Sequence, residues 1–310
     1  MIKLKRNSNA KPKKWKRNIS MAKRQAGKEY VNRKGQVVSE KKAREKGAVE
    51  TKAEDKKKAA EDNGRSLRTI TFDLQAILTV PFAGESNVLQ KEVISLQQID
   101  TCLLDYLFQL PESVTHITSF SDTCGRQNRN HFIAIAILYA VNKLSHLNII
   151  DMKFMELGNS YLEADSIHPT IECARKHKQV HTTRQWALRV EIARRKPRPY
   201  KVKTLKYSDL QNLASNMLAN RKLTKGSEPV KWLDIKWLIY NKDKSFTIQS
   251  KYELSDENFM EFDVPATHKT GRKMSWNGTQ LCPKNKRLLP VSDVKKNDLL
   301  YLLQTGIIPQ

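Results

Sequence analysis

The stretch SFSDTCGRQNRN (residues 119–130) begins the part of the sequence that determines the fold, and three patterned stretches follow it. NHFIAIAILYAVNKL (130–144) is apolar on nearly every helical face, so it predicts a buried helix. NIIDMKFMEL (148–157) predicts a strand, and GNSYLEADSIHPTIE (158–172) carries acids at helical spacing. SFSD itself is typical of a strand that ends at an acid. The order is therefore strand, acid, helix, strand, acidic helix, which indicates an α/β fold.

The preceding segment extends this pattern toward the N-terminus. TITFDLQAILTV (69–80) is β-branched and apolar, and it predicts a buried strand that ends before Pro81. NVLQKEVISLQQIDTCLLDYLFQL (87–110) predicts an amphipathic helix that Pro111 stops, and VTHITSF (114–120) predicts the next strand. A strand, a helix and a strand of these lengths form a crossover unit, so we expect the two strands to pair in parallel.

The segment that follows is expected to add helices, a hairpin and a C-terminal helix. Helices are predicted at TIECARKHKQ (170–179), TTRQWALRVEIARRK (182–196), SDLQNLASNMLANRK (208–222) and SDVKKNDLLYLLQTGIIP (292–309). Strands are predicted at YKVKTLKY (200–207), IKWLIYNKD (235–243), SFTIQSKYE (245–253) and FMEFDV (259–264), the middle two as a hairpin. Asp165 and Ser208 are plausible N-caps of their helices, and the last helix has Ser292 as its cap and Gly306 as its stop.

Composition divides the chain into three regions. Residues 1–65 are expected to be a basic, largely disordered arm, with a solvent-exposed helix near 50–62 leading into the core. Residues 66–265 are expected to form the core, and 266–310 a linker and a C-terminal helix. The fold class expected for the core is a mixed α/β sheet with flanking helices.

Charge indicates the class of partner. The chain has 56 Lys and Arg against 32 Asp and Glu, a net charge of +24, and residues 1–65 alone hold 22 basic and 8 acidic residues. Such an excess favours a polyanion, most often DNA, although a solubilising tail or a nuclear address gives the same composition. The predicted contact residues in the arm are Lys11, Lys13, Lys14, Trp15, Lys16 and Arg17, with Trp15 able to stack on a base.

Cysteine and hydropathy patterns address the compartment. The four cysteines form no CxxC pair and fit no zinc module. No apolar run has the length of about 18 residues that a membrane span needs. The basic N-terminus lacks the apolar segment of a secretory signal. We therefore expect a nuclear, intracellular protein without membrane contact, and the sequence leaves its oligomeric state open.

Carboxylates at the ends of the predicted strands are the candidate catalytic and metal-binding residues. Asp73 and Asp122 lie in or at the end of separate β-runs, where adjacent strands could bring them together. Asp165 and Glu172 lie seven residues apart on one helical face, and either could be the third acid. Converging carboxylates suit a pair of Mg²⁺ or Mn²⁺ ions about 4 Å apart, the arrangement used for phosphoryl transfer.

Each acid also has a structural alternative. Asp73 could face solvent, and Asp122 could be an ordinary turn former. Asp165 is a natural helix N-cap, with Pro169 in the first turn. Glu172 could only offset the basic residues that follow it.

A polar turn follows Asp122 and contributes Gln127, Asn128 and Arg129 as further candidate nucleic-acid contacts. Amide side chains at a strand-to-helix junction can contact phosphates. The alternative is a hydrogen-bonded loop in which Asn130 caps the helix that follows, and the two roles are compatible.

These motifs resemble those of a transposon-derived animal protein family of unknown function. The likeness rests on SFSDTCGRQNRN, GNSYLEADSIHPTIE and FDLQ, on the basic opening RNISMAKRQAGKEYVNRKGQVV and on the ending DVKKNDLLYLLQTGIIP. The resemblance implies an RNase H-like core related to DDE/D transposases. It also implies that Asp73, Asp122 and Asp165 (or Glu172) are the catalytic acids, with Mg²⁺ or Mn²⁺ as cofactor.

The chain departs from the family pattern at several places. Arg126 replaces a glycine of the family's CGGQNRN, and Asn159 replaces a histidine of GHSYLEAD. Between Asp73 and Asp122 the sequence predicts one helix and leaves no room for the two further strands that an RNase H-like fold has there. We therefore expect a truncated core whose ancestral transposase activity is weak or lost and whose remaining function is DNA binding. The alternatives are an active metal-dependent nuclease or transposase, a non-enzymatic nuclear scaffold, and a non-functional remnant.

Overall fold

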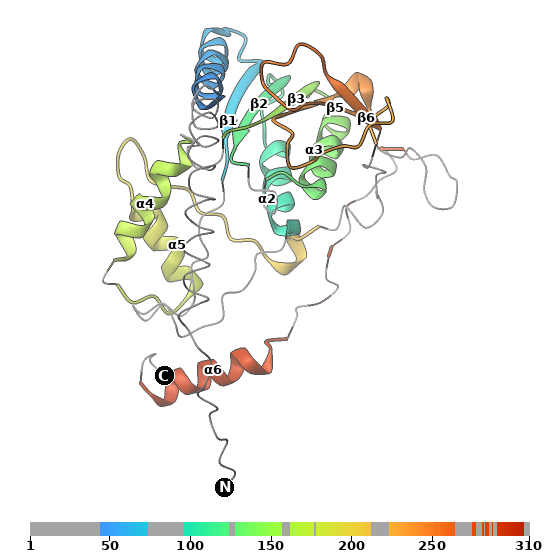
Figure 1. Cartoon of the computed structure of the whole chain (residues 1–310). Helices are drawn as coiled ribbons and strands as arrows, with labels where there is room; N and C mark the ends of the chain where they lie inside the picture. Colours follow the sequence, from blue (N-terminus) through green and yellow to red (C-terminus); the bar gives the residue numbers. More distant parts are fainter. Residues whose placement is uncertain are drawn as a thin grey trace, which may run out of the picture. The chain divides into compact units, whose positions relative to one another are not determined.

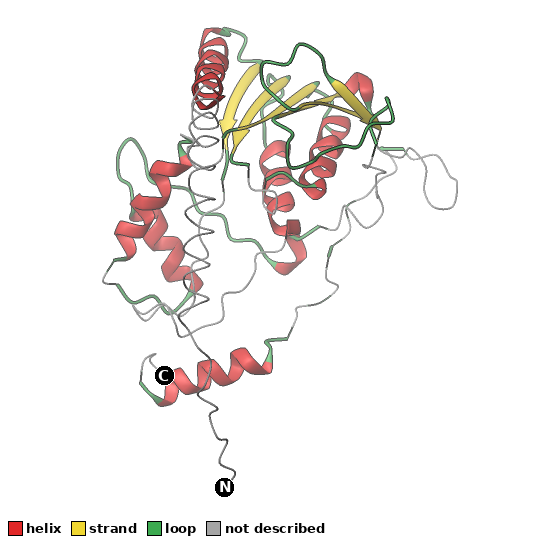
Figure 2. Cartoon of the chain, viewed as in Figure 1, coloured by secondary structure: helices red, strands yellow, loops and turns green. Residues whose placement is uncertain are grey.

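The chain folds around one mixed β-sheet with helices on both of its faces (Figures 1 and 2). The computed structural model describes residues 44–73, 96–123, 128–156, 162–176, 178–211, 223–263, 275–276, 281, 283–284, 287 and 290–306. The described residues from 48 onward belong to one compact unit. The fold class expected from the sequence is confirmed at the level of a mixed α/β sheet flanked by helices.

The sheet has six strands, which lie in their order along the chain. They are β1 (Leu67–Thr71), β2 (His116–Ser121), β3 (Ile149–Phe154), β4 (Trp237–Asn241), β5 (Thr247–Lys251) and β6 (Met260–Asp263). β1, β2 and β3 pair in parallel, and β4, β5 and β6 continue the sheet in antiparallel pairing. The predicted parallel crossover and the predicted hairpin are both confirmed. β1 lies at one edge, and no described strand pairs with its outer side.

One face of the sheet holds the main hydrophobic core. α2 (Leu96–Phe108) and α3 (His131–Lys143) contact each other and cover this face. Alternate strand residues point into it, because successive side chains in a strand face opposite sides. The largest fully buried ones from the strands are Ile117, Ile150, Met152, Phe154, Tyr240 and Phe262. Each aliphatic or aromatic side chain buried here contributes about 1.5–3 kcal/mol to stability.

The predicted character of α3 is confirmed. Every residue from Ile133 to Val141 is buried, as expected for a helix that is apolar all round. Asn130 caps it, since its side-chain oxygen accepts hydrogen bonds from the backbone N–H groups of Phe132 and Ile133. The cap stabilises the helix start by about 1 kcal/mol.

The opposite face of the sheet is more polar, and a helix over residues 44–61 packs on it. Ala48, Lys52 and Asp55 of this helix are all buried, and their spacing places them on one helical face. Asp55 accepts a 2.6 Å hydrogen bond from Lys153 of β3, and its carbonyl accepts one from the Thr69 hydroxyl of β1. The helix expected near 50–62 is confirmed and most of its residues are exposed, but one of its faces docks on the sheet instead of facing solvent. Because the helix docks on the sheet, the compact unit begins at residue 48, before the core boundary at 66 that composition suggested.

A second polar cluster on this face joins three strands. The Asp151 carboxylate is buried, and its Oδ2 lies 2.5 Å from Nε2 of His116 on β2. Its Oδ1 accepts a 2.6 Å hydrogen bond from the Trp237 indole of β4. The carboxylate thus ties β2, β3 and β4 together by side-chain bonds that add to the ladder.

Of the helix predicted over residues 208–222, residues 212–222 lie outside the described residues. The remaining described helices overlap the predicted ones but differ at their ends. They are α4 (Ala164–Arg175), α5 (Thr183–Ile192) and α6 (Asp293–Gln304), with Thr182 and Ser292 as the caps of the last two. α4 begins six residues before the predicted Thr170, so Pro169 lies inside the helix. Residues 200–206 are not the predicted strand but an exposed loop, followed by a 3₁₀ turn (Tyr207–Asp209). The alternating pattern YKVKTLKY finds no neighbouring strand to pair with among the described residues.

Candidate functional site

The first two predicted acids follow the carboxyl ends of two neighbouring parallel strands, Asp73 two residues after β1 and Asp122 one residue after β2. Register pairs Thr71 of β1 with Phe120 of β2, and the Phe72 N–H donates to the Phe120 carbonyl just beyond β1. If the chain kept this register for two more residues, Asp73 would stand opposite Asp122, one strand spacing or about 4.8 Å away at the main chain. Asp73 follows β1 by two residues rather than lying within a strand. The strand order agrees with the adjacency expected from the sequence, and the proximity of the two carboxylates stays a prediction.

The turn after Asp122 is held by side-chain hydrogen bonds. The Asn128 amide donates to Asp122 Oδ1 at 2.5 Å, and Asn128 itself is buried. The Arg129 guanidinium is buried as well, with Nη1 donating to the Ile235 carbonyl (2.9 Å) and Nη2 to the Thr123 carbonyl (3.1 Å). Together with the Asn130 cap, these bonds support the reading of this turn as a hydrogen-bonded loop. Gln127, the third residue predicted here as a nucleic-acid contact, lies outside the described residues.

The candidates for the third acid lie on α4 and have partners there. The Asp165 carboxylate accepts a 2.8 Å hydrogen bond from the Leu162 N–H, reaching back across the helix start. The prediction of Asp165 as the N-cap was wrong, because Glu163 stands at that position and Asp165 lies in the first turn of α4. Glu172 forms an ion pair with Arg175 on the next turn. Both carboxylates are thus engaged at the two ends of α4.

The fit of the chain to a metal ion can be tested on its donor groups. Within the described ranges, no three His, Cys, Asp or Glu side chains converge closely enough to hold an ion. Another carboxylate at the same sheet edge, Glu156 after β3, is turned into an ion pair with Lys236 (2.9 Å). The described donors therefore do not fit the Mg²⁺ or Mn²⁺ site that the resemblance implies, and no catalytic step follows from them.

A charge cluster that the sequence did not single out lies beside the end of β1. Glu163, at the start of α4, pairs with Lys52 (3.1 Å) and Lys56 of the 44–61 helix. Burial would raise the pKa of Glu163, but hydrogen bonds from Lys56, the Thr71 hydroxyl and Lys52 outweigh it and hold the pKa at about 2. The cluster fastens α4 to the helix that covers the polar face, close to where Asp73 follows β1. Nothing in the local sequence reveals a contact between residues more than a hundred positions apart.

This cluster predicts acid sensitivity. A carboxyl group has a pKa near 4.5 when exposed and about 2 in the fold, so its contribution to stability is present above pH 4.5 and is lost as the pH falls toward 2. Because the Glu163 side chain is about half exposed (47%), solvent screening reduces that contribution to about 1–2 kcal/mol. Urea unfolding between pH 7 and pH 3 is expected to show a shallower loss of stability in Glu163→Gln than in the wild type.

Glu61→Gln is the matched control for this measurement. Glu61 is exposed and has only a 3.8 Å ion pair with Lys57 one turn away. The pH profile of this variant should follow the wild type. A Glu163→Gln profile as steep as that of the wild type would show that Glu163 is not the group that titrates.

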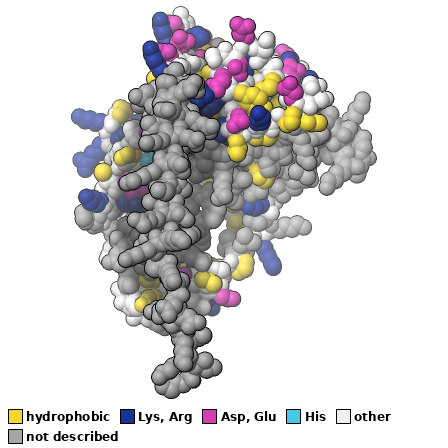
Figure 3. All heavy atoms as spheres, viewed as in Figure 1, with side chains coloured by type: hydrophobic (Ala, Val, Ile, Leu, Met, Phe, Trp, Pro, Cys, Tyr) yellow, Lys and Arg dark blue, Asp and Glu magenta, His cyan; other side chains and the backbone are white. Residues whose placement is uncertain are grey.

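A basic tract, residues 175–206, is the most strongly charged described segment. It contains twelve Lys or Arg residues and one acid, Glu191. Nine of the basic residues are exposed: Lys176, Lys178, Arg184, Arg195, Lys196, Arg198, Lys201, Lys203 and Lys206. Lys and Arg side chains gather over α4 and α5, as the dark-blue atoms of Figure 3 show. The sequence identified part of this tract only as a basic helix, and a local charge count would have identified the whole.

The tract is held by contacts within the fold. Lys203 forms an ion pair with Asp105 of α2, which attaches the loop to the core. The Arg194 guanidinium lies 4.1 Å above the Tyr200 ring and donates to the Arg198 carbonyl at 3.0 Å. These contacts hold residues 194–203 in place, and the exposed Lys and Arg side chains of the tract face the solvent.

The predicted nucleic-acid contacts of the arm, Lys11, Lys13, Lys14, Trp15, Lys16 and Arg17, lie outside the described residues. None of the described helices has the length and hydrophobicity needed to cross a membrane. No protein-family model, curated protein or solved structure matches the chain, so its function has to be inferred from its own residues and their geometry.

Proposed function

We propose that the chain is a nucleic-acid-binding protein that contacts the phosphates of DNA, derived from a transposase and lacking an effective catalytic site. The observation that carries the proposal is the basic tract. Its exposed cations suit a polyanion, because each Lys or Arg placed at a phosphate releases condensed counterions. The same chemistry makes a small acidic ligand a weaker choice, since it could engage only a few of these charges at once.

An RNase H-like, DDE/D-type origin is part of this proposal. Parallel strands with helices packed on the sheet, and Asp73 and Asp122 at neighbouring strand ends, support it. The sheet continues from β3 in antiparallel strands, and no described strand flanks β1, which agrees with a core truncated between the two acids. Glu172 and Glu156, which are held in ion pairs with Arg175 and Lys236, are consistent with a binding role.

Salt-dependent DNA binding tests the proposal. In the full chain, Arg195, Lys196, Arg198 and Lys201 are replaced together by Gln, and affinity for a labelled duplex is measured by fluorescence anisotropy from 50 to 200 mM salt. Losing four phosphate contacts should reduce the slope of log K against log salt by about 3–4 and lower the affinity at 0.1 M salt by about a hundredfold or more.

The control replaces four exposed lysines outside the tract, Lys57, Lys58, Lys231 and Lys296, by Gln. This variant has the same net charge as the tract variant, so it separates local contacts from the overall field of the protein. Equal losses in the two variants would contradict the basic tract as the contact surface.

The arm is proposed as a second contact and as the nuclear address. Replacement of Lys11, Lys13, Lys14, Lys16 and Arg17 by Gln tests both roles: the salt slope reports DNA contact, and a fluorescent fusion reports localisation. A protein that stays nuclear and keeps its full salt slope after this change would limit DNA binding to the folded tract.

A further inference from the structure

The outer edge of β1 offers unused main-chain hydrogen-bonding groups. On the β2 side, the Ser66 carbonyl accepts from the His116 N–H and the Phe72 N–H donates to the Phe120 carbonyl. The even-numbered residues of β1 therefore direct their main-chain groups toward β2. The odd-numbered residues Leu67, Thr69 and Thr71 direct their main-chain groups outward, away from β2. The Leu67 N–H is taken by the Asp62 carboxylate (2.7 Å), whereas the N–H and C=O of Thr69 and the N–H of Thr71 have no partner in the described part of the chain.

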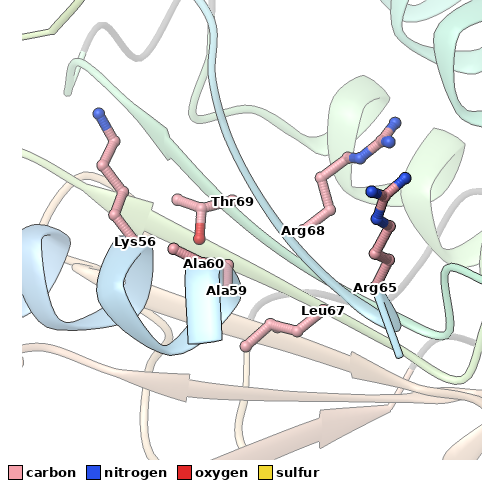
Figure 4. Close-up of a pocket in the computed structure, with 7 residues that line it drawn as sticks. All are labelled: Lys56, Ala59, Ala60, Arg65, Leu67, Arg68 and Thr69. Atoms are coloured by element: carbon pink, nitrogen blue, oxygen red, sulfur yellow. The ribbon is translucent and has the colours of Figure 1, made fainter. Parts of the chain in front are cut away.

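A pocket of about 310 Å³ adjoins this edge, between β1 and the end of the 44–61 helix (Figure 4). Its lining comprises Lys56, Ala59, Ala60, Arg65, Leu67, Arg68 and Thr69, with three cations and no acid. Lys56 is paired with Glu163, while neither Arg65 nor Arg68 forms an ion pair among the described residues. In Figure 4 both arginine side chains extend from the backbone at the start of β1. The edge therefore combines open strand positions with uncompensated positive charge.

We propose that the outer edge of β1 and this pocket bind an acidic segment of a protein partner, which adds to the sheet as an extended strand. The main chain supplies the affinity common to strand addition, because one residue of an antiparallel strand can exchange two hydrogen bonds with Thr69. Arg65 and Arg68 supply the selectivity, since each can pair with a carboxylate of the added strand.

Two other occupants fit the edge less well. A second copy of the chain would bring the same cations to both sides of the new strand pair, and like charges across a strand pair are destabilising. A nucleic acid could satisfy the arginines but has no alternating N–H and C=O groups to match those of Thr69 and Thr71. The inference is independent of DNA binding, because the basic tract contributes no residue to the pocket.

The test uses the full chain and a synthetic peptide of about eight residues, alternating glutamate and valine. Peptide binding is measured by fluorescence, and amide hydrogen exchange is followed at Thr69 and Thr71. The peptide should slow exchange at both amides. An analogue with glutamine in place of glutamate should bind about tenfold or more weakly, and so should the acidic peptide to an Arg65→Gln/Arg68→Gln variant. The basic-tract variant should bind the acidic peptide as the wild type does.

Two substitutions at Thr69 separate main-chain pairing from charge. Thr69→Pro removes the outward N–H without touching a bond to β2, so it should abolish exchange protection at Thr71. Thr69→Val keeps the N–H and should bind normally. Unchanged peptide affinity in the arginine variant would overturn the proposal. So would slow exchange of the Thr69 and Thr71 amides in the free protein, or slowing of their exchange by a DNA duplex in the absence of peptide. Dimerisation of the chain through this edge would overturn it as well. If Thr69→Pro fails to fold, the arginine variant and the exchange data still decide.

Discussion

Replacing Lys153 by Met is expected to lower the free energy of unfolding by about 3–5 kcal/mol. The Lys153 side chain is 5% exposed and that of Asp55 is 13% exposed, and their charged atoms lie 2.6 Å apart. Removing the ammonium would leave the Asp55 carboxylate buried beneath the 44–61 helix without its counter-charge. The cost of such an uncompensated charge exceeds the loss of an ordinary hydrogen bond, because water cannot solvate the carboxylate where it lies.

The double variant Asp55→Leu/Lys153→Met makes this prediction specific. A buried ion pair and a pair of apolar side chains of similar volume often give nearly equal stability. Adding Asp55→Leu should therefore restore most of the free energy of unfolding that Lys153→Met removes. Lys153 also lies 4.1 Å from the Trp237 ring, and a Met side chain keeps favourable contact with that aromatic face. Urea unfolding followed by circular dichroism measures all three proteins.

The exposed pair Lys57 and Glu61 on the same helix serves as the control. These side chains are 75% and 65% exposed, so Lys57→Met should change stability by less than about 0.5 kcal/mol. A cost below about 1 kcal/mol for Lys153→Met, or a double variant as unstable as the sum of the single ones, would contradict the buried pair.

The Asp55–Lys153 ion pair is also a feature that could not be predicted from the sequence. Residues with a strong local signal were predicted well: the apolar run of α3 with its Asn130 cap, and the final helix with its Ser292 cap. Those features depend on neighbours within one or two turns. The Asp55–Lys153 contact joins positions 98 residues apart, and no periodicity in the 44–61 helix distinguishes a docked charged helix from a solvated one.

The candidate site divides in the same way. The parallel pairing of the two strands that precede Asp73 and Asp122 could be predicted, because a strand, a helix and a strand of these lengths form a crossover unit. The place of α4 could not, since it depends on the Glu163 contacts with Lys52 and Lys56. The strand predicted at 200–207 was wrong. Alternating apolar and polar residues are compatible with a strand, but they do not show whether a neighbouring strand is available to pair with it.

Arg129 should affect stability and not DNA affinity. Its buried guanidinium joins the turn after Asp122 to the segment before β4 through the carbonyls of Thr123 and Ile235, and it lies 5.7 Å from the Phe154 ring. Arg129→Met would leave both carbonyls without these donors, and each buried unsatisfied group costs about 1–3 kcal/mol. We expect a total loss of about 2–4 kcal/mol in urea unfolding. The stability of Arg129→Lys should lie between those of the wild type and Arg129→Met, because an ammonium cannot donate to both carbonyls in the geometry of a guanidinium.

The competing prediction, that Arg129 contacts nucleic acid, has the opposite signature. A phosphate contact would make Arg129→Met weaken DNA binding with little loss of stability, and Arg129→Lys would retain most of the affinity because the positive charge remains. Arg184, exposed on α5, is the matched comparison: Arg184→Met should leave unfolding unchanged and reduce the salt slope of DNA binding by about 1. Anisotropy measured well below the unfolding midpoint of each variant keeps the two effects apart. If Arg129→Met lost affinity while still fully folded, the polar turn after Asp122 would join the basic tract as part of the DNA-binding surface.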